Sequence, residues 1–346
     1  MPASDRFLQA ARNEPTDRVP VWLMRQAGRY QPSYRELRKR HGMLEIALSP
    51  QLAAEVTVRP VQDYGLDAAI LFSDIMVPLG PAGVRYEIRE GVGPVVEEPV
   101  RTGAAVAALA VYDAALREPE TAEAVERAVA ALDGVPLIGF AGAPFTLASY
   151  LVEGRPSRTY AETKRLMWSR PATWGALMDV LSDIVLRHLI LQVKAGAAAV
   201  QLFDSWAGAL SPSDYEASVL PYVRRIFQGL EPYGVPRIYF AVGAGHLTAC
   251  LAATGATVLG VDWRQELSSV RRQLGPELAL QGNLDPVALL APWAVTEERA
   301  RAVLEGMAGE PGYIFNLGHG VLPTTEPDQV LRLARFVHEP RFAAHR

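Results

Sequence analysis

The sequence predicts an α/β protein that folds as a single (β/α)8 TIM barrel. Eight short apolar runs recur along its 346 residues, and each is followed by a polar or glycine-rich turn and then by a helical pattern. Apolar runs with little alternation are typical of strands covered on both faces, and their alternation with helices predicts a parallel sheet. The runs are Val19–Met24, Ala68–Ser73, Val135–Ala141, Ala197–Phe203, Pro236–Val242, Thr257–Trp263, Leu278–Asn283 and Tyr313–Gly318.

Helix signals lie between these runs, where a barrel requires helices. Ser33 and Glu36 have the spacing of a capping box, which predicts a helix over residues 33–40. Proline at the start and glycine after the end predict two further helices over residues 50–64 and 144–153.

One stretch, residues 77–100, departs from the alternation. It is rich in glycine and proline and contains short alternating segments, so we expect a small hairpin inserted after the second strand. No linker or shift in composition divides the chain, and we expect one domain over residues 1–346. The rival fold is an open doubly wound sheet. The number of runs and the lack of a GxGxxG motif after the first one favour the barrel.

The composition argues against several classes of protein. A net charge of −4 does not suit general nucleic-acid or membrane-surface binding. The single cysteine, Cys250, excludes an internal disulfide and predicts a reducing, cytoplasmic location. His246 precedes it by four residues, a spacing that zinc could use, but without a second cysteine we expect no metal site. Residues 135–152 and 241–261 lack charges at nearly the length of a membrane span, yet glycine or proline interrupts both, so we expect none.

Polar residues that follow the strands of a barrel meet at one rim, where the active sites of such enzymes lie. Arg25 and Arg29 follow the first run, Asp74 the second, Ser205 the fourth and His319 the eighth. These residues also have structural interpretations. Asp74 and Ser205 suit turn or helix caps, and His319 lies between glycines that would let the backbone approach a ligand or a phosphate closely.

The segment 25–40 carries a local positive charge in an otherwise acidic chain. It contains six basic residues against one acid. Arginine binds carboxylates and phosphates through a planar fork that stays charged at any working pH. For Lys39 and Arg40 we expect a solvated helix face, whereas Arg25 and Arg29 directly follow a buried strand and are expected to contact a ligand. The residues alone therefore indicate a cofactor-independent barrel enzyme with an anion-binding mouth, without naming its substrate.

Five motifs resemble the uroporphyrinogen decarboxylase family, in the expected order and over essentially the whole chain. Phe145 and Asp204 stand where some members carry Trp and Glu. The motifs are MRQAGRY (Met24–Tyr30, extended by QPSYRELR), FSDI (Phe72–Ile75), GFAGAPFTLASYLVEG (Gly139–Gly154), LFDSWAG (Leu202–Gly208) and NLGHGVLP (Asn316–Pro323).

The resemblance implies a homodimer that converts uroporphyrinogen III to coproporphyrinogen III in haem biosynthesis, by decarboxylating four acetate side chains without a cofactor. It implies that Asp74 faces the pyrrole N–H groups and that Asp74 and Arg25 are the candidate catalytic residues. The implied substrate contacts are Arg25, Arg29 and Arg38 to carboxylates, Tyr150, Ser205 and His319 to the acetate or propionate arms, and Phe140 and Phe203 as apolar walls.

This chemistry suits the residue types. The pair of electrons left when CO2 departs needs a sink, and a pyrrole protonated at a ring α-carbon provides one. A carboxylate such as Asp74 about 4 Å from that cation would stabilise it by roughly 4 kcal/mol at an effective dielectric near 20. Arg25 is a poor acid near pH 7 and is expected first to clamp a carboxylate. The alternatives are a barrel methyltransferase of the same superfamily, which as a family expectation needs cysteine-ligated zinc, and a non-catalytic tetrapyrrole-binding protein.

Overall fold

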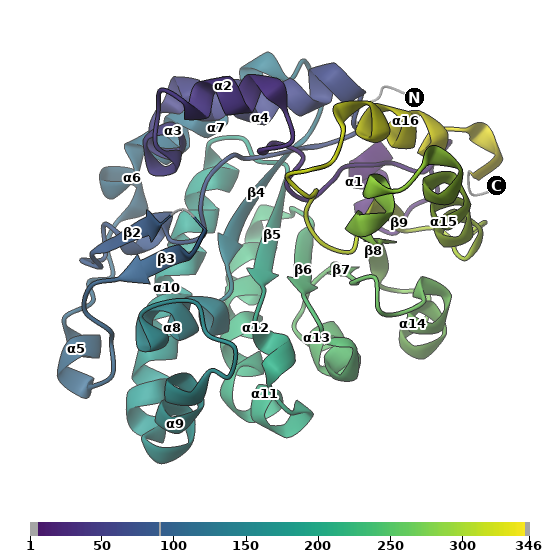
Figure 1. Ribbon diagram of the computed structural model, residues 1–346. Helices are drawn as coiled ribbons and strands as arrows, with labels where there is room; N and C mark the ends of the chain where they lie inside the picture. Colours follow the sequence, from purple (N-terminus) through teal and green to yellow (C-terminus); the bar gives the residue numbers. More distant parts are fainter. Residues whose placement is uncertain (1–5, 90, 343–346) are drawn as a thin grey trace.

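The computed structural model describes residues 6–89 and 91–342. Its main sheet is a curled parallel sheet of seven strands in the order β1-β4-β5-β6-β7-β8-β9, with α4, α7 and α10 packed against β1 and β4 (Figure 1). The main-sheet strands are β1 Ala69–Ile70, β4 Leu137–Gly142, β5 Ala199–Asp204, β6 Arg237–Ala241, β7 Val258–Gly260, β8 Ala279–Leu284 and β9 Tyr313–Leu317.

Seven of the eight predicted strands are confirmed, and the first is wrong as a strand. Segment 19–24 forms only an isolated bridge between Val21 and Phe315 of β9. The Phe315 N–H donates to the Pro20 carbonyl at 2.9 Å, and the Asp67 N–H donates to the Val21 carbonyl, also at 2.9 Å. Pro20 has no N–H to continue a ladder, which explains why an apolar run fails to become a regular strand here.

Helices follow the strands around the sheet. The α-helices are α1 Arg6–Ala11, α2 Pro32–Arg38, α3 Met43–Leu48, α4 Pro50–Tyr64, α5 Gly103–Ala107, α6 Ala114–Arg117, α7 Pro119–Ala131, α8 Pro144–Glu153, α9 Ala161–Ser169, α10 Pro171–Lys194, α11 Pro212–Ser218, α12 Leu220–Leu230, α13 Thr248–Ala252, α14 Leu267–Leu274, α15 Trp293–Glu305 and α16 Pro327–Val337. The 3-10 helices are η1 Val77–Leu79, η2 Ala207–Ala209, η3 Glu231–Tyr233, η4 Gly245–Leu247, η5 Pro286–Leu290 and η6 Pro340–Phe342. In the described residues no helix combines the length and apolar character needed to cross a membrane.

The helix predictions over 50–64 and 144–153 are confirmed, and both helices end at a left-handed glycine, Gly65 or Gly154. The predicted capping box is wrong. Helix α2 starts at Pro32, and its N-cap residue, Gln31, makes no side-chain cap. Because proline favours the first helical position, Ser33 falls inside the first turn and cannot cap it.

Residues 77–100 contain a separate two-stranded antiparallel sheet, β2 Tyr86–Arg89 and β3 Gly93–Val96. Figure 1 shows the pair to one side of the curled main sheet. The Val96 N–H donates to the Gly154 carbonyl at 2.8 Å, and the Val100 N–H donates to the Leu151 carbonyl at 2.9 Å. The pair is therefore tied to the end of α8, the helix that follows β4.

Segment 19–24 is anchored inside the curl as well as at its edge. The indole of Trp22 donates to the side-chain oxygen of Gln281 at 2.9 Å, and Gln281 donates to Gln201 at 3.1 Å. All three side chains are buried. Buried hydrogen bonds of this kind fix the segment in place because leaving any partner unpaired costs about 1–3 kcal/mol. The chain therefore leaves this segment at a defined point, immediately before Arg25.

Candidate active site

Arg25 is presented by a tight turn that β9 holds in place. The Met24 N–H donates to Asn316 Oδ1 at 2.9 Å, and the Val321 N–H donates to the Met24 carbonyl at 2.8 Å. Arg25 itself adopts φ +58°, a left-handed conformation that costs a residue with a Cβ atom about 1–3 kcal/mol. Its side chain fills the space beside Gly320, where a Cβ atom would lie 2.6 Å from Arg25 Cγ.

Gln26 and Tyr30, which follow the two arginines of the MRQAGRY motif, have structural roles. The fully buried side chain of Gln26 accepts the Leu23 N–H at 3.0 Å and donates to the Ala68 carbonyl at 3.1 Å. The Tyr30 hydroxyl in turn donates to the Gln26 carbonyl at 2.7 Å. Gln26 and Tyr30 therefore lock the turn, while Arg25 and Arg29 keep access to solvent.

Arg25, Arg29, Asp74 and Tyr150 share one electrostatic neighbourhood. Burial and the Arg29 charge lower the pKa of Arg25, and Tyr150 and Asp74 oppose that shift. Arg25 thus combines solvent access with crowding by protein atoms, as expected of a side chain in a recess. Among the described residues, Arg25 and Asp74 form no direct ion pair and the Arg25 guanidinium makes no hydrogen bond, so both groups keep capacity for a ligand.

Asp74 caps a turn, as its structural interpretation predicts, but it uses only one carboxylate oxygen to do so. Its Oδ1 accepts the Met76 N–H at 2.9 Å and so caps the turn that leads into η1. In the described part of the chain Oδ2 has no hydrogen-bond partner. Burial raises the pKa of Asp74, and the Met76 N–H and the Arg25 charge oppose this rise. The half-buried carboxylate is therefore both a cap and a group that interacts electrostatically with Arg25.

His319 is a neutral hydrogen-bond donor. The Gly320 N–H donates to its Nδ1 at 2.6 Å, which leaves the proton on Nε2. Burial, Arg25 and Arg264 lower the pKa of His319 to about 4. We expected the flanking glycines to let the backbone approach a ligand closely. In the structure this space is occupied instead, by Arg25 at Gly320 and by Trp263 at Gly318.

An aromatic row runs across the ends of the strands. The ring centroids of Phe140 and Phe203 are 5.5 Å apart, those of Phe203 and Phe240 are 6.3 Å apart, and those of Phe240 and His319 are 6.5 Å apart. The structure thus brings together the two predicted wall residues. It also adds Phe240, which sequence reasoning missed although it is the register partner of Phe203 in the next strand.

Tyr150 is half-buried and packs on Trp206, with ring centroids 4.0 Å apart. Burial, followed by Asp74, raises the pKa of Tyr150, and Arg25 opposes the rise. Trp206 and the exposed Ser205 follow β5, and the Ser205 hydroxyl makes no hydrogen bond to any described residue. Tyr150 is therefore not a core tyrosine with a satisfied hydroxyl, and its charge partners place it with Arg25 and Asp74.

A buried hydrogen-bond network lies beneath this loop. Asp204 accepts from the hydroxyls of Thr146 and Tyr239, both at 2.6 Å, and the Tyr215 hydroxyl donates to Tyr239 at 2.8 Å. Thr146 also accepts the Trp206 N–H at 3.3 Å. Burial raises the pKa of Asp204 to about 6, and the two hydroxyls that donate to it limit the rise. Asp204 is the last residue of β5, at the predicted rim, but its fully buried side chain supports the loop from within.

Burial raises the pKa of Tyr34, and the charges of Arg38 and Arg29 partly oppose this rise. The Tyr34 ring lies 5.4 Å from that of Phe72, two residues before Asp74. Arg38 is half-buried, and its Nη1 is buried with no hydrogen-bond partner in the described residues. An unpaired buried cationic donor is costly, and an anionic ligand would satisfy it.

Lys39 and Arg40 are solvated, as predicted, but they follow helix α2, which ends at Arg38, and do not lie on a helix face. Both side chains are exposed, and Lys39 pairs with Glu36 at 2.6 Å on the surface.

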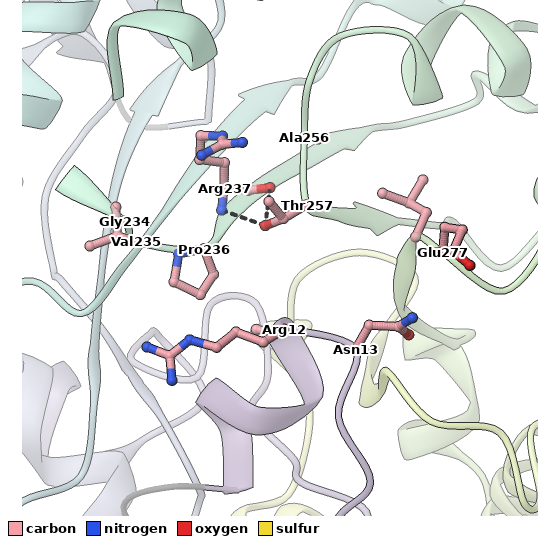
Figure 2. Close-up of a pocket in the computed structure, with 11 residues that line it drawn as sticks. Arg12, Asn13, Gly234, Val235, Pro236, Arg237, Ala256, Thr257 and Glu277 are labelled. Carbon is pink, nitrogen blue, oxygen red and sulfur yellow. Dashed lines mark hydrogen bonds between the residues drawn. The ribbon is translucent and has the colours of Figure 1, made fainter. Parts of the chain in front are cut away.

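A cavity of about 410 Å³ lies at the opposite end of the sheet, at the starts of β6, β7 and β8. Figure 2 shows Arg12, Arg237 and Thr257 around it, with Arg237 and Thr257 hydrogen-bonded to each other. Because the predicted site residues follow the strand ends, this cavity is not their pocket. The described residues contain no group of three or more His, Cys, Asp or Glu side chains that could hold a metal ion.

The curled parallel sheet and its surrounding helices define a class of protein, an α/β fold in which Arg25 and Asp74 follow the ends of two predicted strands and interact electrostatically. The chain belongs to the uroporphyrinogen decarboxylase family, because the family model described as Uroporphyrinogen decarboxylase (URO-D) matches residues 2–340.

Relatives named uroporphyrinogen decarboxylase are similar along almost their whole length. The protein of Sorangium cellulosum is 53% identical over 335 residues, which cover 96% of this chain and 96% of the relative. That of Streptomyces griseus is 51% identical over 334 residues, covering 96% of this chain and 91% of the relative. That of Geobacillus kaustophilus is 49% identical over 336 residues, covering 97% of each.

Solved structures of other proteins share the fold. A methyltransferase from Methanosarcina mazei superposes with a TM-score of 0.81 at 22% identity, over 97% of this chain and 98% of that one. A putative vitamin-B12-independent methionine synthase from Listeria monocytogenes superposes with a TM-score of 0.56 at 12% identity, over 93% and 97% of the two chains. At these identities the likeness concerns the fold alone.

Proposed function

We propose that this chain is a carboxy-lyase that decarboxylates the four acetate side chains of uroporphyrinogen III and gives coproporphyrinogen III in porphyrin and haem biosynthesis. The observation that carries the proposal is that Arg25, Asp74 and Tyr150 interact electrostatically with one another in a chain from this family. The acidic chain has a local excess of positive charge in segment 25–40, as capture of a polycarboxylate requires.

In this proposal the arginines bind the carboxylates of the substrate, and the carboxylate of Asp74 stabilises the cationic pyrrole ring. Arg25, Arg29 and Arg38 bind substrate carboxylates, and Phe140 and Phe203 form an apolar wall. Asp74 Oδ2 accepts pyrrole N–H groups at the centre of the macrocycle. Tyr150, Ser205 and neutral His319 donate hydrogen bonds to the acetate or propionate arms, which the free Ser205 hydroxyl and the proton on His319 Nε2 support.

The reaction step uses the substrate as its own electron sink. A proton adds to a ring α-carbon, the bond between the methylene and the carboxylate breaks, and its electron pair moves into the cationic ring as CO2 leaves. A proton then adds to the exocyclic carbon, which becomes a methyl group, and the ring α-carbon loses its extra proton. Asp74 stabilises the cation before CO2 departs. Because its pKa is about 4, His319 is too little protonated near pH 7 to be the main acid.

The finer structural predictions belong to the same proposal. We infer one domain over residues 1–346, in which segment 19–24 closes the sheet into an eight-stranded barrel and β2–β3 is an insertion after the second strand. The hydrogen bonds of this segment to Phe315 on one side and Asp67 on the other support closure. We further propose a cytoplasmic homodimer that acts without a cofactor. Sedimentation of the purified protein at several concentrations tests the dimer.

The deciding experiment measures CO2 release from uroporphyrinogen by purified protein freed of metal with a chelator. Release of CO2 with formation of coproporphyrinogen supports the proposal. Tight binding without release would instead indicate a non-catalytic tetrapyrrole carrier. Inactivity that added zinc and a methyl donor convert into methyl transfer would indicate the methyltransferase alternative.

A further inference from the structure

Arg264 is a second fixed guanidinium group at the ends of the strands, outside the 25–40 segment. It follows β7, and its Nη1 donates to Asp262 Oδ2 at 2.8 Å while its backbone N–H donates to Asp262 Oδ1 at 2.9 Å. The guanidinium carbon lies 4.0 Å from the centroid of the Trp263 ring. The ion pair and the stacking hold the head group in one orientation.

Arg264 and Arg25 both act on His319 from segments that pack against different flanking glycines. The Trp263 ring, which carries Arg264, is 6.4 Å from the His319 ring. Trp263 also packs against Gly318, where a Cβ atom would lie 2.9 Å from Trp263 Cβ, and Arg25 packs against Gly320. The loop that holds His319 is therefore packed against Trp263 at Gly318 and against Arg25 at Gly320. Both guanidinium charges lower the pKa of His319, which agrees with this placement.

The ion pair with Asp262 leaves much of the Arg264 head group free. The side chain is 51% exposed, and among the described residues its Nε and Nη2 make no hydrogen bond. Asp262 is itself buried and also accepts the Gly243 N–H at 2.5 Å. A guanidinium group has five N–H donors, so one pairing with Asp262 leaves an edge for another oxyanion.

We propose that Arg264 binds a carboxylate arm of the tetrapyrrole on the side of His319 opposite Arg25, and so extends the anion-binding site beyond the arginines of segment 25–40. This inference rests on the proposed function for the identity of the ligand. The need is physical, because the carboxylates of uroporphyrinogen surround the whole ring and one cluster of arginines reaches only part of that periphery. Arg264 is a binding residue with no part in the bond-breaking step.

The first test compares steady-state CO2 release by wild type, Arg264→Gln and Arg264→Lys. Loss of one charge-assisted contact should raise KM for uroporphyrinogen about 10- to 100-fold in Arg264→Gln with kcat within about twofold. Arg264→Lys should recover part of the loss. Arg272→Gln is the matched control, because it removes one exposed arginine from α14 without touching the site. An unchanged KM in Arg264→Gln overturns the inference while the proposed function stands.

The second test measures binding without turnover and identifies the arm. Uroporphyrin and coproporphyrin, the stable oxidised forms, are titrated against wild type and both variants by fluorescence. Equal weakening of both ligands assigns Arg264 to a propionate, and weakening of uroporphyrin alone assigns it to an acetate. Unchanged affinity for both overturns the inference, even if wild type releases no CO2 and the proposed function fails. Should Arg264→Gln unfold, Arg264→Lys decides, because loss of the planar fork alone should weaken binding.

Discussion

At the scale of single residues, Asp74 uses one of its two oxygens for structure. Oδ1 caps the turn into η1, and Oδ2 has no hydrogen-bond partner among the described residues, so we propose that it binds the ligand. A carboxamide has the same shape and can still accept the Met76 N–H, so substitution by Asn removes the charge and keeps the cap. The two roles of Asp74 can therefore be separated by one change.

Asp74→Asn should leave the fold intact and reduce turnover about a thousandfold. The expected loss follows from about 4 kcal/mol of cation stabilisation that acts in the transition state. Single-turnover CO2 release measures the loss, and thermal unfolding shows whether the fold is retained. Turnover within a few-fold of wild type would mean that Asp74 does not act through its charge.

Arg25→Lys should keep the charge and lose the fork. Lysine presents a point charge and cannot bind a carboxylate with two parallel hydrogen bonds, so kcat/KM should fall about 10- to 100-fold. Arg40→Lys, on the solvated end of the same segment, is the matched control and should stay near wild type. Full activity of Arg25→Lys would show that charge alone suffices at this position.

Site residues could be predicted from the sequence where they directly follow a strand or lie in a motif. Arg25, Asp74, Tyr150 and His319 were proposed in this way, and in the structure Arg25 interacts electrostatically with the other three. Phe240 and the packing at Gly318 and Gly320 could not be found in the same way. They depend on which strands are neighbours and on which side chain fills a gap, and both are set by contacts far apart in the sequence.

At the scale of elements, the conformation of the MRQAGRY turn is stabilised by one buried side-chain amide that forms hydrogen bonds with two backbone groups. Gln26 bridges the Leu23 N–H and the Ala68 carbonyl, so it joins the turn to the chain that enters β1. The geometry of Arg25, with its left-handed backbone, depends on this bridge. The buried polar groups of Gln26 and Tyr30 in this motif therefore serve folding, and only its two arginines are proposed to bind a ligand.

Gln26→Ala should destabilise the protein by about 2–5 kcal/mol, because it leaves two buried backbone groups unpaired and creates a cavity. Urea unfolding followed by circular dichroism measures this change. Gln51→Ala, at an exposed position near the start of α4, is the control and should change the free energy of unfolding by less than about 0.5 kcal/mol. A similar small change in Gln26→Ala would contradict the bridging role.

At the scale of the whole molecule, the order of strands follows the order of apolar runs, and this explains why seven strands could be predicted. The first run, residues 19–24, is as apolar as the others, yet Pro20 interrupts its hydrogen bonding and only Val21 forms a bridge. How that run lies between β9 and the start of β1 depends on hydrogen bonds to Phe315 and Asp67. A local sequence pattern cannot predict hydrogen bonds to such distant residues, so the apolar run predicted a regular strand where only a single bridge forms.

The Asp204 network joins β5, β6, α8 and α11, and it should make the stability of the whole molecule depend on pH. The folded-state pKa of Asp204 is about 6, above the ordinary value of 3.8. A raised carboxyl pKa means that the folded state holds a proton that the unfolded state has lost. Its stabilising contribution is therefore full below about pH 3.8 and disappears as the pH rises through about 6, a total change of about 3 kcal/mol.

Asp204→Asn should remove this dependence, because the amide does not titrate and can still accept from Thr146 and donate to Tyr239. Between pH 4.5 and 7.5 the unfolding free energy of wild type minus that of the variant should fall by about 2 kcal/mol as the pH rises. The measurement is urea unfolding at matched ionic strength across this range. Asp133→Asn, an exposed and left-handed position that tolerates Asn, serves as the control. A constant difference between wild type and Asp204→Asn would show that Asp204 stays ionised in the folded protein, and the network would then stabilise a buried charge.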